Sequence, residues 1–222
     1  MEDPRGRKQP VRVALALAAL VVVAAGCGSG GGESSKIAEE AGCEEVGTPS
    51  PKDTTLPAPE QTVKPGEKLT AVVKASCGSF EIALDTKVAP KTTNSFAYLA
   101  REGFYDGLDF NRILPGLIVQ GGDPAGDGTG GPGYTITEPP AADLEYTKGV
   151  VAMAKEFEEP SGRSGSQFFV VTSLDAGYPP EYALLGEVSK GYKTVKRISE
   201  LYGRNEKPKI PVLIEEVTIE KG

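Results

Sequence analysis

The chain contains no histidine and no tryptophan, and only three of its 222 residues are cysteines. The absence of histidine excludes Ser-His-Asp and Cys-His catalysis, histidine metal sites and histidine-based pH switches. Cys27, Cys43 and Cys77 are too few for a disulfide-built miniprotein and lack the C-x-x-C spacing of a zinc knuckle. We therefore expect neither a metal site nor a cofactor.

Positive charge is also scarce, because 24 Lys and Arg residues stand against 31 Asp and Glu residues, a net charge of −7. Nonspecific binding to nucleic acid needs a positive face that displaces phosphate counterions, so we do not expect nucleic acid as a partner. The 28 glycines and 18 prolines make up about a fifth of the chain. This share favours loops and short strands over a helical bundle.

The one long apolar run lies at the N-terminus, over residues 13–25. Four basic residues precede it, and small residues follow it up to Cys27. As a helix this run would be about 20 Å long, too short for a hydrocarbon layer of roughly 30 Å. The pattern predicts a signal peptide over residues 1–26 that is removed from the mature protein.

The sequence Ala24-Ala25-Gly26-Cys27 resembles the processing site of bacterial lipoproteins, in which the cysteine becomes the lipid-bearing first residue. The resemblance implies an extracytoplasmic protein that is anchored to the bacterial cell membrane through lipid on Cys27. Ordinary cleavage and secretion is the alternative.

Residues 27–66 are polar and rich in glycine and proline, which predicts a flexible tether. In an oxidising compartment, a disulfide between Cys43 and Cys77 would clamp this tether onto the domain that follows. Two unpaired thiols are the alternative.

The segments after residue 66 have the lengths and apolar patterns of short strands and two helices. The expected strands cover residues 69–74, 80–84, 113–120, 150–154, 168–172, 183–188 and 212–219, and the expected helices begin at Pro90 and Tyr192. We therefore expect one mainly β domain over residues 67–222, a β-barrel capped by two helices, in a monomeric protein.

Three motifs follow one another in this domain: F-N-R-I-L-P-G-L-I-V-Q-G-G-D at 110–123, G-D-G-T-G-G-P-G-Y at 126–134 and G-S-Q-F-F at 165–169. Together they resemble the cyclophilin family of peptidyl-prolyl cis-trans isomerases, over about residues 68–220. The resemblance implies an eight-stranded antiparallel β-barrel capped by two α-helices, with proline-containing polypeptides as partners. The glycine-rich segment lacks the Gly-Lys-Ser/Thr of a phosphate-binding loop, so we interpret it as backbone turns.

The resemblance assigns Arg112 as the catalytic arginine and Gln120 as the glutamine that orients it and binds the substrate backbone. The substrate-binding positions that it implies are Leu117, Ile118, Ala154, Lys155, Gln167, Phe169, Tyr182 and Leu185. Arg112 and Gln120 are eight residues apart, and this even spacing would put them on one face of a regular strand. Phe168 and Phe169 are adjacent, so one should face the core, and we assign Phe168 to it.

An arginine can promote rotation about an Xaa-Pro bond without any covalent step. Rotation about an Xaa-Pro bond must break amide resonance, against a barrier of about 18–20 kcal/mol. In the twisted state the prolyl nitrogen regains its lone pair, and a permanently charged guanidinium can donate to it. We therefore expect Arg112 to stabilise the twisted imide in secreted or envelope proteins. The alternative is a non-catalytic or weakly catalytic chaperone or scaffold that binds proline peptides on the same fold, with turnover weakened by Leu117 and Leu185.

Overall fold

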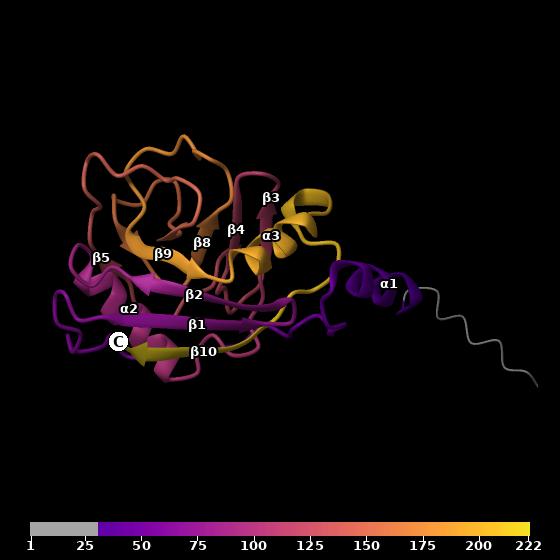
Figure 1. Cartoon of the computed structure of the whole chain (residues 1–222). Coiled ribbons are helices and arrows are strands. Elements are labelled where there is room, and N and C mark those ends of the chain that lie inside the picture. The colour runs from indigo at the N-terminus through magenta and orange to yellow at the C-terminus, as the bar shows by residue number, and fades with distance from the viewer. Residues whose placement is uncertain (1–30) are drawn as a thin grey trace, which may run out of the picture.

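The computed structural model describes residues 31–222, so the expected signal peptide and Cys27 lie outside the described residues. An eight-stranded antiparallel sheet dominates the fold, with the strands in the spatial order β10-β1-β2-β9-β6-β8-β4-β3 (Figure 1). Its strands are β1 (Leu69–Ala75), β2 (Gly78–Leu84), β3 (Arg112–Leu114), β4 (Ile118–Gly121), β6 (Val150–Met153), β8 (Phe168–Val171), β9 (Leu184–Lys190) and β10 (Ile214–Lys221). Two short strands, β5 (Ile136–Thr137) and β7 (Arg163–Ser164), pair separately.

The sheet curls until the chain segments next to its two edge strands meet. An isolated β-bridge joins Asp109, just before β3, to Leu213, just before β10. The Phe110 N–H also donates to the Val212 carbonyl at 2.9 Å. The expected mainly β, eight-stranded architecture is thus confirmed, as a strongly curled sheet.

Helices α2 (Pro90–Arg101) and α3 (Tyr192–Glu200) are the two that the sequence predicts. Proline stands at the start of α2, where its missing N–H and fixed φ cost nothing. Phe96 and Leu99 of α2 and Ile198 of α3 are fully buried. Each helix thus covers the sheet with an apolar face. No helix within residues 31–222 is long and apolar enough to cross a membrane.

The expected single strand over residues 113–120 is wrong, because this segment is the hairpin of β3 and β4. The Leu117 N–H donates to the Leu114 carbonyl at 3.0 Å, which closes a four-residue turn. Pro115 and Gly116 occupy its centre, and Gly116 has a φ of 70°. This is the pattern of a type II turn, which needs positive φ at its third residue.

The expected flexible tether also needs correction over its described part. Residues Gly31–Ala41 form helix α1, which lies beside the end of the sheet where β1 turns into β2 (Figure 1). Gly42 ends the helix with a φ of 66°, and the Cys43 N–H donates to the Ala38 carbonyl at 2.8 Å, as in a Schellman motif. The disulfide between Cys43 and Cys77 is present. The helix is held by this bridge and by the burial of Ala38, neither of which local propensity reveals.

After the disulfide, the chain runs extended over the domain as far as β1. The Lys52 N–H donates to the Pro124 carbonyl at 2.8 Å, and the Leu56 N–H donates to the Pro132 carbonyl of the glycine-rich segment at 2.9 Å. Further on, the Asn94 side chain of α2 accepts from the N–H groups of Thr62 and Val63. We call residues 44–68 the strap. The strap is polar and rich in proline and has no regular structure of its own before β1, and it is held in place because the domain supplies partners for its backbone N–H groups.

Apolar side chains form two clusters on opposite faces of the sheet. The main core contains Phe80, Phe96, Phe110 and Phe168. A smaller cluster consists of Ile118, Tyr146, Ala152, Phe169 and Val171. Phe168 therefore lies in the main core, as the alternation of a strand predicts, and its neighbour Phe169 lies on the other face.

Candidate active site

A row of paired residues crosses four strands beside the second cluster. Arg112 lies opposite Gln120, Gln120 opposite Phe169, and Phe169 opposite Ala152. Directly paired residues project to the same face of a sheet. Register alone therefore brings a cation, an amide and an aromatic ring together, and the hairpin explains the proximity of Arg112 and Gln120 better than their even spacing does.

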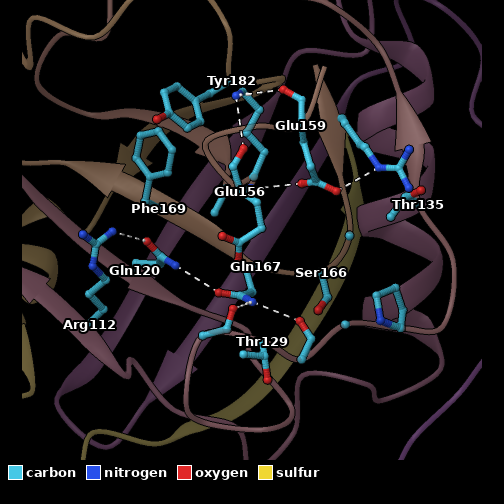
Figure 2. Close-up of a pocket in the computed structure, with 18 of the residues that line it drawn as sticks. Arg112, Gln120, Thr129, Thr135, Glu156, Glu159, Ser166, Gln167, Phe169 and Tyr182 are labelled. Carbon is cyan, nitrogen blue, oxygen red and sulfur yellow. Dashed lines mark hydrogen bonds and ion pairs between the residues drawn. The ribbon is translucent and has the colours of Figure 1, made fainter. Parts of the chain in front are cut away.

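Hydrogen bonds join the polar members of this row into a chain (Figure 2). Arg112 Nη1 donates to Gln120 Oε1 at 3.3 Å, and Gln120 Nε2 donates to Gln167 Oε1 at 3.0 Å. Gln167 Nε2 in turn donates to the carbonyl oxygens of Gly128 and Gly130, at 2.8 and 3.0 Å. The chain fixes the orientation of both amides, because each carbonyl oxygen faces a donor.

The glycine-rich segment is held by the buried carboxylate of Asp123. Its two oxygens accept from the backbone N–H groups of Ala125, Gly128 and Gly130. This arrangement agrees with the interpretation of the glycines as backbone turns, because a protein carboxylate occupies the N–H groups that a phosphate would need. The turns form one wall of a groove of about 900 Å³, which is also lined by Arg112 and Phe169.

Aromatic rings form the apolar end of this groove. Phe169 is 2% exposed, and its ring centroid lies 5.4 Å from that of Tyr182 and 6.0 Å from that of Tyr178, both at nearly perpendicular angles. Beneath them, the Tyr146 hydroxyl donates to the Tyr182 carbonyl at 2.6 Å. Burial raises the pKa of Tyr146 to about 12, so this hydroxyl stays protonated near neutral pH. The rings of Phe169, Tyr178 and Tyr182 thus give an aromatic wall that suits an apolar ring.

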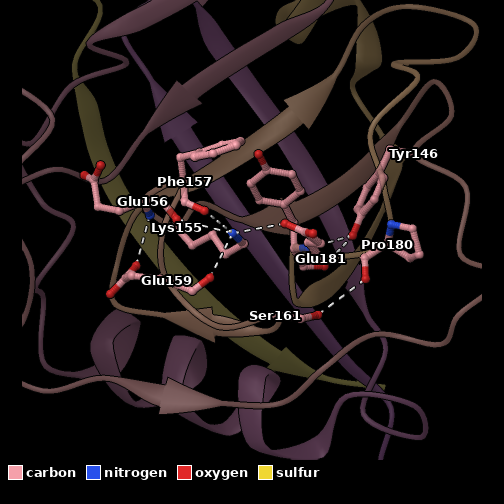
Figure 3. Close-up of polar contacts among 9 residues, drawn as sticks. Tyr146, Lys155, Glu156, Phe157, Glu159, Ser161, Pro180 and Glu181 are labelled. Carbon is pink, nitrogen blue, oxygen red and sulfur yellow. Dashed lines mark hydrogen bonds and ion pairs between the residues drawn. The ribbon is translucent and has the colours of Figure 1, made fainter.

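Lys155 lines the groove, but its side chain is turned into its own loop and is buried there (Figure 3). Its side chain is 1% exposed, and its ammonium forms an ion pair with Glu181 at 3.2 Å. The same ammonium donates to the carbonyl oxygens of Glu156, Phe157 and Glu159, at 3.3, 3.3 and 3.1 Å. The loop over residues 155–159 therefore wraps around the Lys155 ammonium, with its carbonyl oxygens pointing at the charge. The side chain of Phe157 is 91% exposed at the rim of the groove.

Most residues that the sequence assigns to the site line this groove. They are Arg112, Gln120, Ile118, Ala154, Lys155, Gln167, Phe169 and Tyr182. Leu117 and Leu185 do not. Leu117 ends the turn and packs against the second cluster.

Leu185 is fully buried in the main core, so its assignment to substrate binding is wrong. Leu184 is the residue paired with Ala152, across a bulge in the register between β6 and β9. The alternation along β9 therefore turns Leu185 to the face opposite the groove.

The sequence analysis missed Tyr178 and Glu206. Tyr178 lines the groove from an irregular loop before two prolines, where no periodicity indicates which way a side chain points. Glu206 contacts Arg112 directly: Arg112 Nε donates to Glu206 Oε2 at 2.6 Å. These two residues are 94 positions apart, so only the fold reveals the pair. Within residues 31–222, no group of three or more metal-ligating side chains is placed to hold an ion.

The sequence matches the family model described as cyclophilin type peptidyl-prolyl cis-trans isomerase/CLD over residues 70–219. Peptidyl-prolyl cis-trans isomerase B of Streptomyces anulatus is 36% identical over 174 residues, which cover 69% of this chain and 98% of that protein. Peptidyl-prolyl cis-trans isomerase A of Mycobacterium tuberculosis is 33% identical over 177 residues, which cover 71% of this chain and 96% of that protein.

A solved structure supports the same relationship. The cyclophilin type isomerase of Cryptosporidium parvum, crystallised in the presence of the dipeptide Ala-Pro, superposes with a TM-score of 0.64 at 26% identity. The match covers 69% of this chain and 99% of that one. The chain therefore belongs to the cyclophilin-type peptidyl-prolyl cis-trans isomerases and is an isomerase enzyme.

Proposed function

We propose that this isomerase acts on Xaa-Pro bonds of exported or envelope proteins, and that Arg112 supplies the catalytic hydrogen bond. The carrying observation is that one groove holds the Arg112 guanidinium, the Gln120 amide and the Phe169 ring. The three lie on adjacent paired positions of β3, β4 and β8. An arginine beside an apolar niche suits prolyl isomerisation, because the niche can hold the proline ring while the guanidinium donates to the twisted imide.

The reaction breaks no covalent bond, so the protein needs neither a nucleophile nor a proton carrier. Reaching millisecond turnover means lowering the rotational barrier by about 6 kcal/mol, through tighter binding of the twisted amide than of either planar isomer. The twist pyramidalises the prolyl nitrogen and localises its lone pair. Arg112 donates to that lone pair, an interaction that the planar amide cannot accept.

The remaining groove residues hold the substrate in place. Phe169, Ile118 and Tyr182 pack against the proline ring, which keeps it still while the acyl side of the bond rotates. Gln120 offers its amide both to Arg112 and to the peptide backbone. The groove has a volume of about 900 Å³, which leaves room for a proline together with its neighbouring residues.

The location is the second part of the proposal: Cys27 carries lipid and holds the enzyme at the outer face of the membrane. Residue 31, where α1 begins, follows Cys27 by only four positions, which even fully extended span at most about 14 Å. Since α1 packs on the domain, such an anchor holds the domain close to the bilayer. Intact mass of the mature protein tests this: a lipid-modified Cys27 as first residue is expected, and an unmodified terminus contradicts the anchor.

The catalytic proposal is tested by cis-to-trans rates on a proline tetrapeptide. Arg112→Ala should lower kcat/KM by about 100-fold or more, the usual loss for a preorganised transition-state donor. Its unfolding midpoint should stay close to that of the wild type, because Arg112 is partly exposed. Binding of the peptide by the wild type without acceleration would instead identify a proline-peptide-binding module.

A further inference from the structure

The guanidinium of Arg112 is fixed at two points by residues from different elements. On one side Nη1 donates to Gln120, and on the other Nε donates to a carboxylate oxygen of Glu206 at 2.6 Å. The second contact is also an ion pair between side chains that are 41% and 47% exposed. Two contacts in the plane of a guanidinium define its orientation and use two of its five N–H groups.

Glu206 reaches Arg112 from a backbone that non-glycine residues rarely adopt. Asn205 and Glu206 have φ values of 53° and 62°, and they are the only non-glycine residues with positive φ among residues 31–222. This left-handed conformation is disfavoured for a residue that has a Cβ atom. Glycine would be the unstrained choice at either position.

The same turn is tied down on both sides of Glu206. The Gly203 N–H donates to the Lys207 carbonyl at 2.8 Å, and the Lys207 N–H donates to the Arg204 carbonyl at 3.1 Å. The Lys207 ammonium also donates to the Gly126 carbonyl of the glycine-rich wall at 2.8 Å. The turn therefore bridges from the end of α3 to the groove, and it delivers the Glu206 carboxylate to Arg112.

We propose that Glu206 is a positioning residue for the isomerase reaction, which holds the Arg112 guanidinium toward the groove before substrate binds. The inference rests on the proposed role of Arg112. An unrestrained arginine side chain samples many rotamers, and part of this freedom would have to be lost on the way to the transition state. The pair with Glu206 removes that cost from the catalytic step. It acts on orientation, so it should affect kcat more than KM.

Strain and positioning can be separated with three variants, each assayed in the full mature chain for kcat, KM and unfolding midpoint. Glu206→Gly relieves the left-handed backbone but releases Arg112, so kcat should fall about 10-fold with KM unchanged and the midpoint unchanged or higher. Glu206→Gln keeps an acceptor for Arg112 Nε and should recover most of the loss. Asn205→Gly relieves strain next to Glu206 without touching Arg112, and its kcat should equal that of the wild type.

Arg112→Ala in the same assay distinguishes this inference from the proposal on which it rests. A large loss in Arg112→Ala together with wild-type kcat in Glu206→Gly overturns the positioning role alone. An equal loss of kcat in Glu206→Gly and Asn205→Gly also overturns it, because disturbance of the turn would then be sufficient. Wild-type turnover in Arg112→Ala overturns both. The double variant Arg112→Ala/Glu206→Gly should be no slower than Arg112→Ala, since Glu206 acts only through Arg112.

Discussion

The aromatic residues on the two faces of the curled sheet differ in what surrounds them. On the inner face Phe168 contacts the rings of Phe96, Tyr105 and Phe110, and all four side chains are fully buried. On the outer face Phe169 contacts tyrosines that are themselves partly exposed at the groove. Adjacent residues of one strand thus belong to a closed core and to the wall of a groove. Phe168 and Phe169 are both buried, so burial alone does not tell a core residue from a groove residue. The exposure of the rings that each one contacts does.

The matched variants Phe168→Ala and Phe169→Ala sharpen this comparison most. Phe168→Ala should lower the unfolding free energy by about 3–5 kcal/mol, because the closed core retains a cavity. Phe169→Ala should cost about 2 kcal/mol, because water can fill the space from the groove. Denaturant unfolding gives both values. In isomerase assays Phe169→Ala should lower kcat/KM about 10- to 100-fold, the loss of roughly 1.5–3 kcal/mol of apolar contact.

Phe168→Ala provides the control for that activity loss. Measured on its folded fraction, its kcat/KM should stay within a few-fold of the wild type, since its ring is turned away from the groove. Equal losses of stability and activity in the two variants would show that the faces are not independent, and the comparison would then fail.

A smaller effect is expected at the seam where the curled sheet closes. Desolvation raises the pKa of Asp109 to about 6, against the attraction of Lys207 and with a contribution from Asp123. The folded-state pKa of Asp109 lies above its unfolded-state value. The contribution of Asp109 to the unfolding free energy is therefore complete below about pH 4 and is lost as the pH rises through 6. Asp109→Asn should therefore raise the unfolding free energy at pH 7, by about 1 kcal/mol after allowance for partial exposure.

The pH series contains its own control. The stability difference between Asp109→Asn and the wild type should shrink to nothing as the pH falls from 7 to 4. If the stability difference were the same at pH 7 and at pH 4, the substitution would act through packing. The charge of Asp109 would then not destabilise the folded protein.

Sequence reasoning worked where a local pattern determines the structure. Alternation separated Phe168 from Phe169, apolar periodicity located α2 and α3, and the three motifs identified the polar chain from Arg112 to Gln167. It failed where long-range contacts decide. Helix α1 depends on the disulfide and on burial of Ala38, and the inward turn of Leu185 depends on a bulge between neighbouring strands.

Turn chemistry accounts for the remaining differences. Pro115-Gly116 is a turn signal inside an apolar run, and the length of that run suggested a single strand. The approach of Glu206 to Arg112 has no sequence signal, because its left-handed backbone lacks the glycine that would mark it. The motifs thus predicted which polar residues would lie together in the groove, whereas the contact between Arg112 and Glu206 required the fold.

The central claim is that Arg112 and Phe169 act on the same proline. A crystal structure of this protein with an Ala-Pro-containing peptide tests it most directly. The account predicts the proline ring against Phe169 and a guanidinium nitrogen of Arg112 about 3 Å from the imide group. A proline bound elsewhere in the groove, or seated on Phe169 with Arg112 turned away from it, would contradict the account.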